Sequence, residues 1–194
     1  MSRKTLWTIG IDEAGRGPIA GPVAVGVVAV RGDLPVSLLL NKDSKQLSPS
    51  ARGVWFNRIK QASQEGQLFF ACALISPTNI DKQGITKSIK LGITKALGKI
   101  EHDPTLTRVL LDGGLRAPDE YEDQQTIIRA DATISIVSLA SVVAKVTRDR
   151  YMEKIARQYP EYNFAKHKGY GTKEHYLLIK QYGLSTIHRK SFCG

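Results

Sequence analysis

The sequence has few of the residues that build disulfide bonds or zinc sites. Its 194 residues include only two cysteines, Cys72 and Cys193, and neither belongs to a metal-binding pair such as Cys-x-x-Cys. Two isolated thiols of this kind are typical of a protein from a reducing compartment. We therefore expect both cysteines to be reduced.

Long apolar segments are also missing. The longest clean apolar run, residues 23–30, is much too short to cross a bilayer. Residues 1–4, which include Arg3 and Lys4, are not followed by the apolar segment of a secretory signal. We expect a cytoplasmic protein that has no membrane partner.

Acidic residues are scarce relative to basic ones. The chain has 28 Lys and Arg against 18 Asp and Glu, a net charge of +10. Residues 145–190 hold 11 of these basic and 4 of these acidic residues, which leaves 17 and 14 for the other 148. An excess of this kind favours an anionic partner, most often nucleic acid, although a generically basic protein is the alternative.

Internal repeats, low-complexity tracts and linkers are absent, so we expect one domain over residues 1–194, with a basic helical C-terminal segment from about residue 145. The first two predicted strands can pair as a hairpin, and Ser48 can cap the first helix. An α/β fold follows, with a mixed central sheet flanked by helices. The hydrophobic pattern predicts strands at 6–12, 23–30, 68–75, 108–112 and 126–130, and helices at 49–65, 85–100, 133–159 and 172–182.

Four acidic residues stand at or beside the ends of predicted strands, namely Asp12, Glu13, Asp112 and Asp131. If they converge at one sheet edge, their mutual repulsion requires a counter-charge, and oxygen ligands suit Mg²⁺ or Mn²⁺. Two such ions could hydrolyse a phosphodiester. The alternative is that these acids are unrelated turn and cap residues.

The segment GRGPIA at residues 15–20 matches the dinucleotide fingerprint GxGxxA, but its context does not fit. That fingerprint must open a helix whose N-terminus binds a pyrophosphate. Here two prolines intervene, at positions 18 and 22, and a valine-rich strand follows. Nucleotide binding of this type is excluded.

Two further features could contact a phosphate backbone. Ser138, Ser141, Lys145 and Arg148 recur at helical spacing and share one helix face, which could equally be an ordinary solvated face. Tyr170 lies in a glycine-rich loop between cations, where it could stack on a base or sugar or pack its ring on the core.

Seven segments closely resemble the bacterial type 2 ribonucleases H, the ribonuclease HII family, and they occur in the family's order over nearly the whole chain. They are GIDEAGRGP at 10–18, DSKQLS at 43–48, LDG at 111–113, AD at 130–131, AKVTRDR at 144–150, HKGYGT at 167–172 and IHRKSF at 187–192.

The resemblance implies an RNase H-like fold and metal-dependent, endonucleolytic cleavage of the RNA strand in RNA–DNA hybrids. It also implies incision on the 5′ side of ribonucleotides embedded in duplex DNA, leaving a 3′-hydroxyl and a 5′-phosphate. By motif position, the four acids resemble the family's catalytic, metal-binding residues, with two Mg²⁺ or Mn²⁺ ions. The loop Gly15, Arg16 and Gly17 resembles the part that senses the 2′-hydroxyl, and Tyr170 resembles the residue that stacks on the following deoxyribose.

The remaining substrate contacts that we expect are Ser44, Lys45, Ser141, Lys145, Arg148 and Lys168. Small departures from the family pattern, at Gln46 and across residues 138–141, could alter phosphate contacts. We expect a monomer with no obligate protein partner and no dedicated clamp-binding peptide. Another nuclease on the same fold, or a non-catalytic nucleic-acid-binding protein, remains the alternative.

Overall fold

The computed structural model describes residues 6–40 and 46–193, and its centre is a mixed five-stranded sheet in the order β3-β2-β1-β4-β5. β1 (Trp7–Ala14), β2 (Val23–Arg31) and β3 (Phe69–Ile75) are antiparallel neighbours, so the predicted hairpin of the first two strands is confirmed. β4 (Thr107–Asp112) and β5 (Asp123–Ile127) continue the sheet parallel to β1. The predicted mixed sheet is confirmed.

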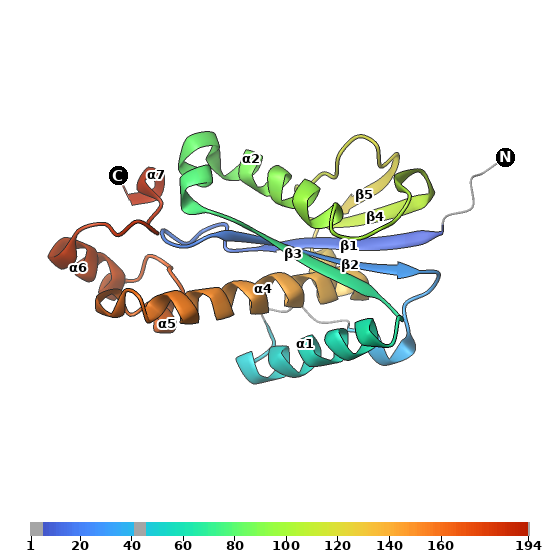
Figure 1. The fold of residues 1–194 in the computed structure, drawn as a ribbon, viewed down its shortest axis with the longest axis horizontal. Coiled ribbons are helices and arrows are strands. Elements are labelled where there is room, and N and C mark those ends of the chain that lie inside the picture. Colours follow the sequence, from blue (N-terminus) through green and yellow to red (C-terminus); the bar gives the residue numbers. More distant parts are fainter. Residues whose placement is uncertain (1–5, 41–45, 194) are drawn as a thin grey trace.

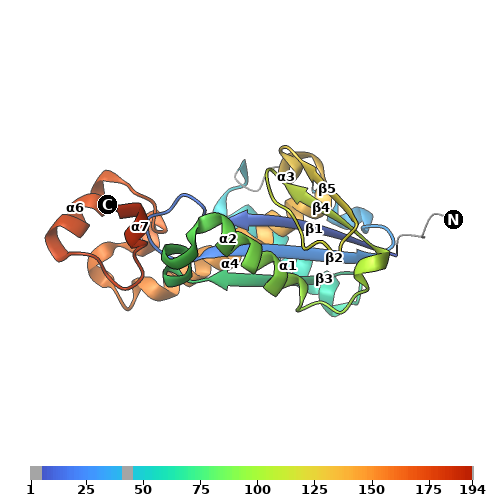
Figure 2. The same cartoon turned by 90° about the horizontal axis from the view of Figure 1, so that it is seen from above.

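Helices cover both faces of the sheet (Figure 1). α2 (Pro77–Leu97) lies on one face, and α4 (Ser135–Ala156), with α1 (Pro49–Gln64) beside it, lies on the other. The short helices α5 (Phe164–His167), α6 (Lys173–Tyr182) and α7 (Lys190–Cys193) gather beyond one end of the sheet (Figures 1 and 2). Short 3-10 turns complete the described elements: η1 (Val36–Leu38), η3 (Pro104–Leu106) and η4 (Pro160–Tyr162).

The sheet divides the hydrophobic core into two layers. Alternate residues of β2 face opposite ways, so Val25 and Val27 pack with α2 while Val28 and Val30 pack with α1 and α4. A third, smaller cluster around Phe164 joins the C-terminal helices to the end of α4. This third cluster fixes the C-terminal part of the chain against the sheet's end.

Local sequence signals set several helix ends as predicted. Ser48 caps α1, because its side chain accepts a hydrogen bond from the Ala51 amide at 3.2 Å. Gly183, with a φ of 77° that suits glycine, follows the last residue of α6 as predicted, whereas Thr172, which was placed inside this helix, caps its N-terminus. The helical region that Pro77 opens is α2, which kinks at Gly84.

The prediction failed at the fifth strand. β5 ends at Ile127 rather than continuing to residue 130, and Ala130 begins a separate one-turn helix, α3 (Ala130–Thr133), which precedes α4. Arg129 adopts a left-handed conformation, φ 59°, which ends the extended chain. The polar sequence of this edge strand has no apolar alternation that could have located it.

Two glycines allow α4 to lie directly on the sheet. A Cβ at Gly10 would overlap the backbone of Ile136, and a Cβ at Gly26 would overlap the carbonyl of Ala140. Gly26 is also the direct partner of Asp12 across β1 and β2. The close approach therefore brings one face of α4 next to Asp12.

No helix within the described residues combines the length and apolarity that a membrane crossing requires.

Gly26→Ala should lower the free energy of unfolding by ~1–3 kcal/mol, because the added methyl group meets helix backbone that cannot rotate away. Gly53→Ala, in α1, is the matched control: its Cβ meets nothing within 4 Å, so helix propensity should raise stability by up to ~1 kcal/mol. Urea unfolding of both variants measures this. Equal stabilities of Gly26→Ala and the parent protein would contradict the close packing of α4.

Candidate active site

The four predicted acids lie at one edge of the sheet. Asp12 and Glu13 lie near the end of β1, and Asp112 ends the neighbouring parallel strand β4. Ile11 pairs with Leu111, so Asp12 and Asp112 are at the same level. The amide of Asp131, in α3, lies 3.5 Å from the Asp112 Oδ1 atom. The sheet register thus brings together residues that are 119 positions apart at most.

Like Asp131, Asp12 is a buried member of this group, with only 3% of its surface exposed. Its Oδ1 atom accepts a hydrogen bond from the Glu13 amide at 2.7 Å, whereas Oδ2 has no hydrogen-bond partner among the described residues. Burial raises the pKa of Asp12 well above its ordinary value, and the charges of Glu13 and Asp112 raise it further. The nearby Ser141 hydroxyl offsets part of this rise in pKa.

Glu13 is also partly buried next to other carboxylates, but it has a cation beside it. Burial and the charge of Asp112 raise the pKa of Glu13, and Arg16 opposes the rise. The Arg16 Nη1 atom is 3.3 Å from the Glu13 Oε1 atom, and half of the Arg16 side chain is exposed. This arginine therefore screens one side of the acidic group.

The chemistry of this group fits a hard divalent cation. The side chains of the group are all carboxylates, which such a cation prefers. A cation beside the unpartnered Asp12 oxygen would also lower the free-energy cost of burying this carboxylate. As they are oriented, no three His, Cys, Asp or Glu side chains in the described part of the chain are close enough to share an ion. Metal binding therefore requires side chains to turn toward a common centre.

The predicted hydroxyl and cation face of α4 points inward rather than into solvent. Ser138, Ser141 and Arg148 are all nearly completely buried. The Ser138 hydroxyl donates to the backbone carbonyl of Asp131 at 2.7 Å, which ties α4 to the short helix α3. This face supports the acidic group from below, so the alternative of a solvated helix face is wrong.

Arg148 does not have the role that its position in the sequence suggested. Its guanidinium donates to the carbonyls of Pro22, Lys168 and Ala20 at 2.9, 2.9 and 3.1 Å. With all these donors committed to backbone, and with the side chain 1% exposed, Arg148 is an internal support and does not contact phosphate.

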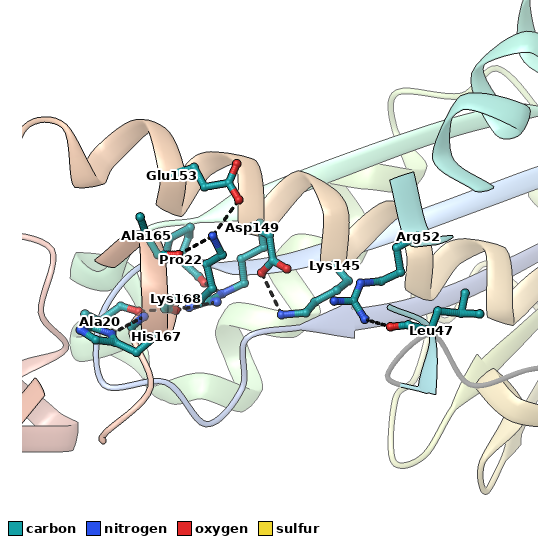
Figure 3. Close-up of polar contacts among 12 residues, drawn as sticks. Ala20, Pro22, Leu47, Arg52, Lys145, Asp149, Glu153, Ala165, His167 and Lys168 are labelled. Carbon is teal, nitrogen blue, oxygen red and sulfur yellow. Dashed lines mark hydrogen bonds and ion pairs between the residues drawn. The ribbon is translucent and has the colours of Figure 1, made fainter. Parts of the chain in front are cut away.

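Lys145 and Lys168 lie nearer the surface, each in an ion pair (Figure 3). The Lys145 Nζ atom is 2.8 Å from Asp149, and the Lys168 Nζ atom is 2.7 Å from Glu153. Beside them a groove of about 470 Å³ runs between α1, α4 and α5. Its charged lining is Arg52, Arg150, Lys166, Lys168, Asp149 and Glu153. The predicted contacts Ser44 and Lys45 lie outside the described residues.

The glycine loop and the tyrosine loop, residues 15–22 and 167–172, are joined directly. The amides of Ile19 and Ala20 both donate to the Gly169 carbonyl, at 2.9 and 3.2 Å. Tyr170 is 46% exposed, so the alternative that its ring packs on the core is wrong. The exposed ring and the exposed residues Arg16 and Gly17 therefore belong to two loops that are hydrogen-bonded to each other.

Three buried histidines support the tyrosine loop. His175 Nδ1 lies 2.9 Å from the Tyr170 carbonyl and His175 Nε2 lies 3.0 Å from His188 Nε2. His188 Nδ1 accepts from the Ser185 amide, so His188 donates to His175 and His175 donates to Tyr170, both as neutral rings. His167 stacks on His175 with ring centroids 4.2 Å apart.

No role was predicted for these three histidines or for Arg189, although the segments HKGYGT and IHRKSF contain three of these four residues. Their importance depends on burial and on partners far along the chain, which residue spacing does not reveal. Histidine within a glycine-rich loop was the only available signal.

Acid should destabilise the protein through this histidine cluster. Burial and the charge of His175 lower the pKa of His188 from 6.5 to about 4. Because the unfolded state binds protons more readily, the stability that neutral His188 contributes is complete above pH 6.5 and is lost as the pH falls toward 4. Urea unfolding at several pH values measures the slope, and His188→Asn should flatten it. An equal slope in the parent protein and the variant would contradict this assignment.

Known proteins with similar sequences cover the whole described fold. The family model "Ribonuclease HII" matches residues 9–194. The ribonuclease HII of Endomicrobium trichonymphae is 41% identical over 94% of this chain and 83% of its own length. That of Shewanella piezotolerans is 42% identical over 94% of this chain and 86% of its own length.

Solved structures agree with these sequence matches. The ribonuclease HII of Archaeoglobus fulgidus, in complex with PCNA, matches with a TM-score of 0.77 at 23% identity, over 95% of this chain and 94% of that chain. Ribonuclease H2 from Pyrococcus horikoshii OT3 matches with a TM-score of 0.72 at 28% identity, over 95% and 93%. The predicted RNase H-like fold is confirmed.

The family model, the curated relatives and the fold agree, and the chain therefore belongs to the ribonuclease HII family: it is a type 2 ribonuclease H, a metal-dependent hydrolase that acts on RNA–DNA hybrids.

Proposed function

We propose that this enzyme incises on the 5′ side of ribonucleotides embedded in duplex DNA, besides cutting the RNA strand of longer hybrids. The products are a 3′-hydroxyl and a 5′-phosphate. The observation that carries the proposal is the buried Asp12 oxygen without a hydrogen-bond partner among the described residues, in a group of acids that is followed in the chain by the exposed residues Arg16 and Gly17. The proposed catalytic acids and the residues proposed to recognise the 2′-hydroxyl are thus only a few positions apart in the chain.

In this proposal Asp12, Glu13, Asp112 and Asp131 are the catalytic, metal-binding residues. Two Mg²⁺ or Mn²⁺ ions bound there would activate the attacking water and stabilise the leaving 3′-oxygen. Ser141 holds Asp12 through its hydroxyl, and Arg16 orients Glu13. The solved structure of Bst-RNase HIII is a complex with Mn²⁺. At 18% identity, this similarity concerns the fold and does not identify the metal of this chain.

Lys145 and Lys168 are the proposed phosphate contacts, together with Ser44 and Lys45. Each of these two described lysines would exchange its carboxylate partner, Asp149 or Glu153, for a phosphate oxygen. The adjacent groove is rich in arginine and lysine and offers the substrate backbone a continuation of this surface.

The glycine loop and Tyr170 supply selectivity in the proposal. Gly17 lets the ribose approach closely, because the space in front of its Cα atom is open, whereas glycine is needed at position 15 because a Cβ there would overlap Arg148 and φ is 92°. The exposed Tyr170 ring stacks on the deoxyribose that follows, so it detects the junction between RNA and DNA. We propose that residues 1–194 do this as a single catalytic domain and a monomer, without an obligate protein partner.

Asp12→Asn should reduce metal-dependent nicking of a duplex with one embedded ribonucleotide by at least ~100-fold, as removal of a group that stabilises transition-state charge does. The variant should be as stable at pH 8 as the parent protein, or more so. Because burial raises the pKa of Asp12, its stabilising contribution exists below the ordinary value of 3.8 and is lost as the pH rises.

Asp119→Asn is the matched control, because the Asp119 side chain is 92% exposed and remote from the acidic group, and it should nick at the parent rate. Denaturing gel electrophoresis of the labelled strand, with and without Mg²⁺, measures both variants. A parent protein that does not nick beside the ribonucleotide when Mg²⁺ is present refutes the proposed function.

Tyr170→Ala should lower kcat/KM on the single-ribonucleotide duplex by about tenfold or more, the value of one stacked sugar or base. Its effect on a long RNA–DNA hybrid should be much smaller, since every position there offers a ribose. Tyr170→Phe retains the ring and should behave as the parent protein. An equal loss of kcat/KM on both substrates with Tyr170→Ala would rule out junction recognition.

A further inference from the structure

Two arginines are buried beneath the glycine loop, and neither is hydrogen-bonded to a carboxylate among the described residues. Arg148 and Arg189 are 1% and 0% exposed. Arg189 donates to the carbonyls of Gly21 at 2.9 Å, Arg16 at 3.0 Å and Gly15 at 2.7 Å. Arg148 donates to carbonyls at positions 20, 22 and 168. The hydrogen bonds of both guanidinium groups go to backbone carbonyls, and Arg189 also lies over the Phe192 ring, 5.2 Å from its centre. The charges of Asp149 and Asp81 favour the charged forms of Arg148 and Arg189 without a hydrogen bond.

Burying two charged guanidinium groups costs free energy, so their burial should serve a purpose other than packing. A buried cation without an acidic partner loses its hydration, and only well-placed hydrogen bonds offset that loss. Burial and the charge of Arg148 lower the pKa of Arg189 to about 9, which still leaves Arg189 charged at pH 7. Both arginines donate hydrogen bonds to the glycine loop. We therefore expect their burial to fix the backbone conformation of that loop.

Peptide geometry shows what Arg189 does to that loop. The C=O and N–H of one trans peptide point in opposite directions, and the described chain has no cis peptide bonds. Because the Gly15 and Arg16 carbonyls point inward to Arg189, the amides of Arg16 and Gly17 point outward. Neither amide donates to another described residue, and both residues are exposed.

We propose that Arg189 is a positioning residue that sets two adjacent peptide planes, so that the Arg16 and Gly17 amides form a fixed pair of donors for the 2′-hydroxyl oxygen of the substrate. This inference rests on the proposed function and adds the residue that determines its specificity. Arg148 makes different hydrogen bonds: it packs against Gly15 but donates to carbonyls in the far half of the loop and, through Lys168, joins that loop to the tyrosine loop.

The test replaces each arginine by lysine. Lysine keeps the charge and most of the stem, but a single ammonium cannot reproduce the fork that meets three carbonyls at once. Arg148→Lys is the matched control, since Arg148 is equally buried and holds the same loop but does not contact the Gly15 and Arg16 carbonyls. The substrates are a duplex with one ribonucleotide and, as a competitive inhibitor, the all-DNA duplex of identical sequence.

Arg189→Lys should raise KM for the ribonucleotide duplex about tenfold, the effect of about one lost hydrogen bond, and leave the inhibition constant of the all-DNA duplex unchanged. Arg148→Lys should leave the ratio of these constants as it is in the parent protein. A purely structural role of Arg189 would reduce the active fraction and so lower kcat without changing KM. Unchanged KM in Arg189→Lys overturns the proposal.

If KM and the inhibition constant rise by the same factor, the two amides meet a phosphate oxygen, which both duplexes have, and the assignment to the 2′-hydroxyl is refuted. A second measurement needs no variant. The Arg16 and Gly17 amide resonances of the metal-free parent protein should shift on addition of the ribonucleotide duplex and stay in place with the all-DNA duplex; shifts of equal size refute the inference.

The inference and the proposed function fail in different ways. A parent protein that does not nick at all refutes the proposed function. A parent protein that nicks selectively, together with an Arg189→Lys variant of undiminished selectivity, refutes only the role of Arg189.

Discussion

The burial of the Asp12 carboxylate between β1 and α4 is the constraint on which the rest of the site depends. Gly10 and Gly26 let α4 approach the sheet so closely that Asp12 loses nearly all contact with water. A carboxylate so placed, with Glu13 and Asp112 beside it, is unfavourable unless a cation compensates it. Under the proposed function, the same packing that builds the core would give the site its affinity for a divalent ion, and folding and metal binding would be coupled at this residue.

The loop proposed to recognise the substrate is close in sequence to the acidic group. Gly15 is two residues beyond Glu13, and the loop that begins there accepts hydrogen bonds from two buried arginines and donates to the Gly169 carbonyl. The histidine cluster then fixes Tyr170 through its own carbonyl. The C-terminal helices, which lie beyond one end of the sheet (Figure 2), therefore support both loops through these hydrogen bonds.

The sequence was sufficient wherever a local pattern determines the structure. Apolar runs located β1 to β4, and Ser48 and Gly183 located helix ends. It was insufficient where contacts with residues distant in the chain determine the structure or the role of a residue. The edge strand β5 has no apolar alternation, Arg148 has the sequence position of a phosphate contact but bonds to carbonyls of a loop more than 100 residues away, and His188 and Arg189 gain their roles only through burial. The resemblance to a family identified the acids, whereas only the fold shows what supports them.

The most direct test of the account is the position of Mn²⁺ in crystals of the protein soaked with that ion, located by anomalous scattering. The account predicts anomalous density in contact with the carboxylates of Asp12 and Asp112, at the shared edge of β1 and β4, with Asp12 Oδ2 among the ligands. Mn²⁺ bound elsewhere at saturating concentration, with Asp12 Oδ2 still without a partner, would contradict the central claim that burial of this carboxylate builds the metal site.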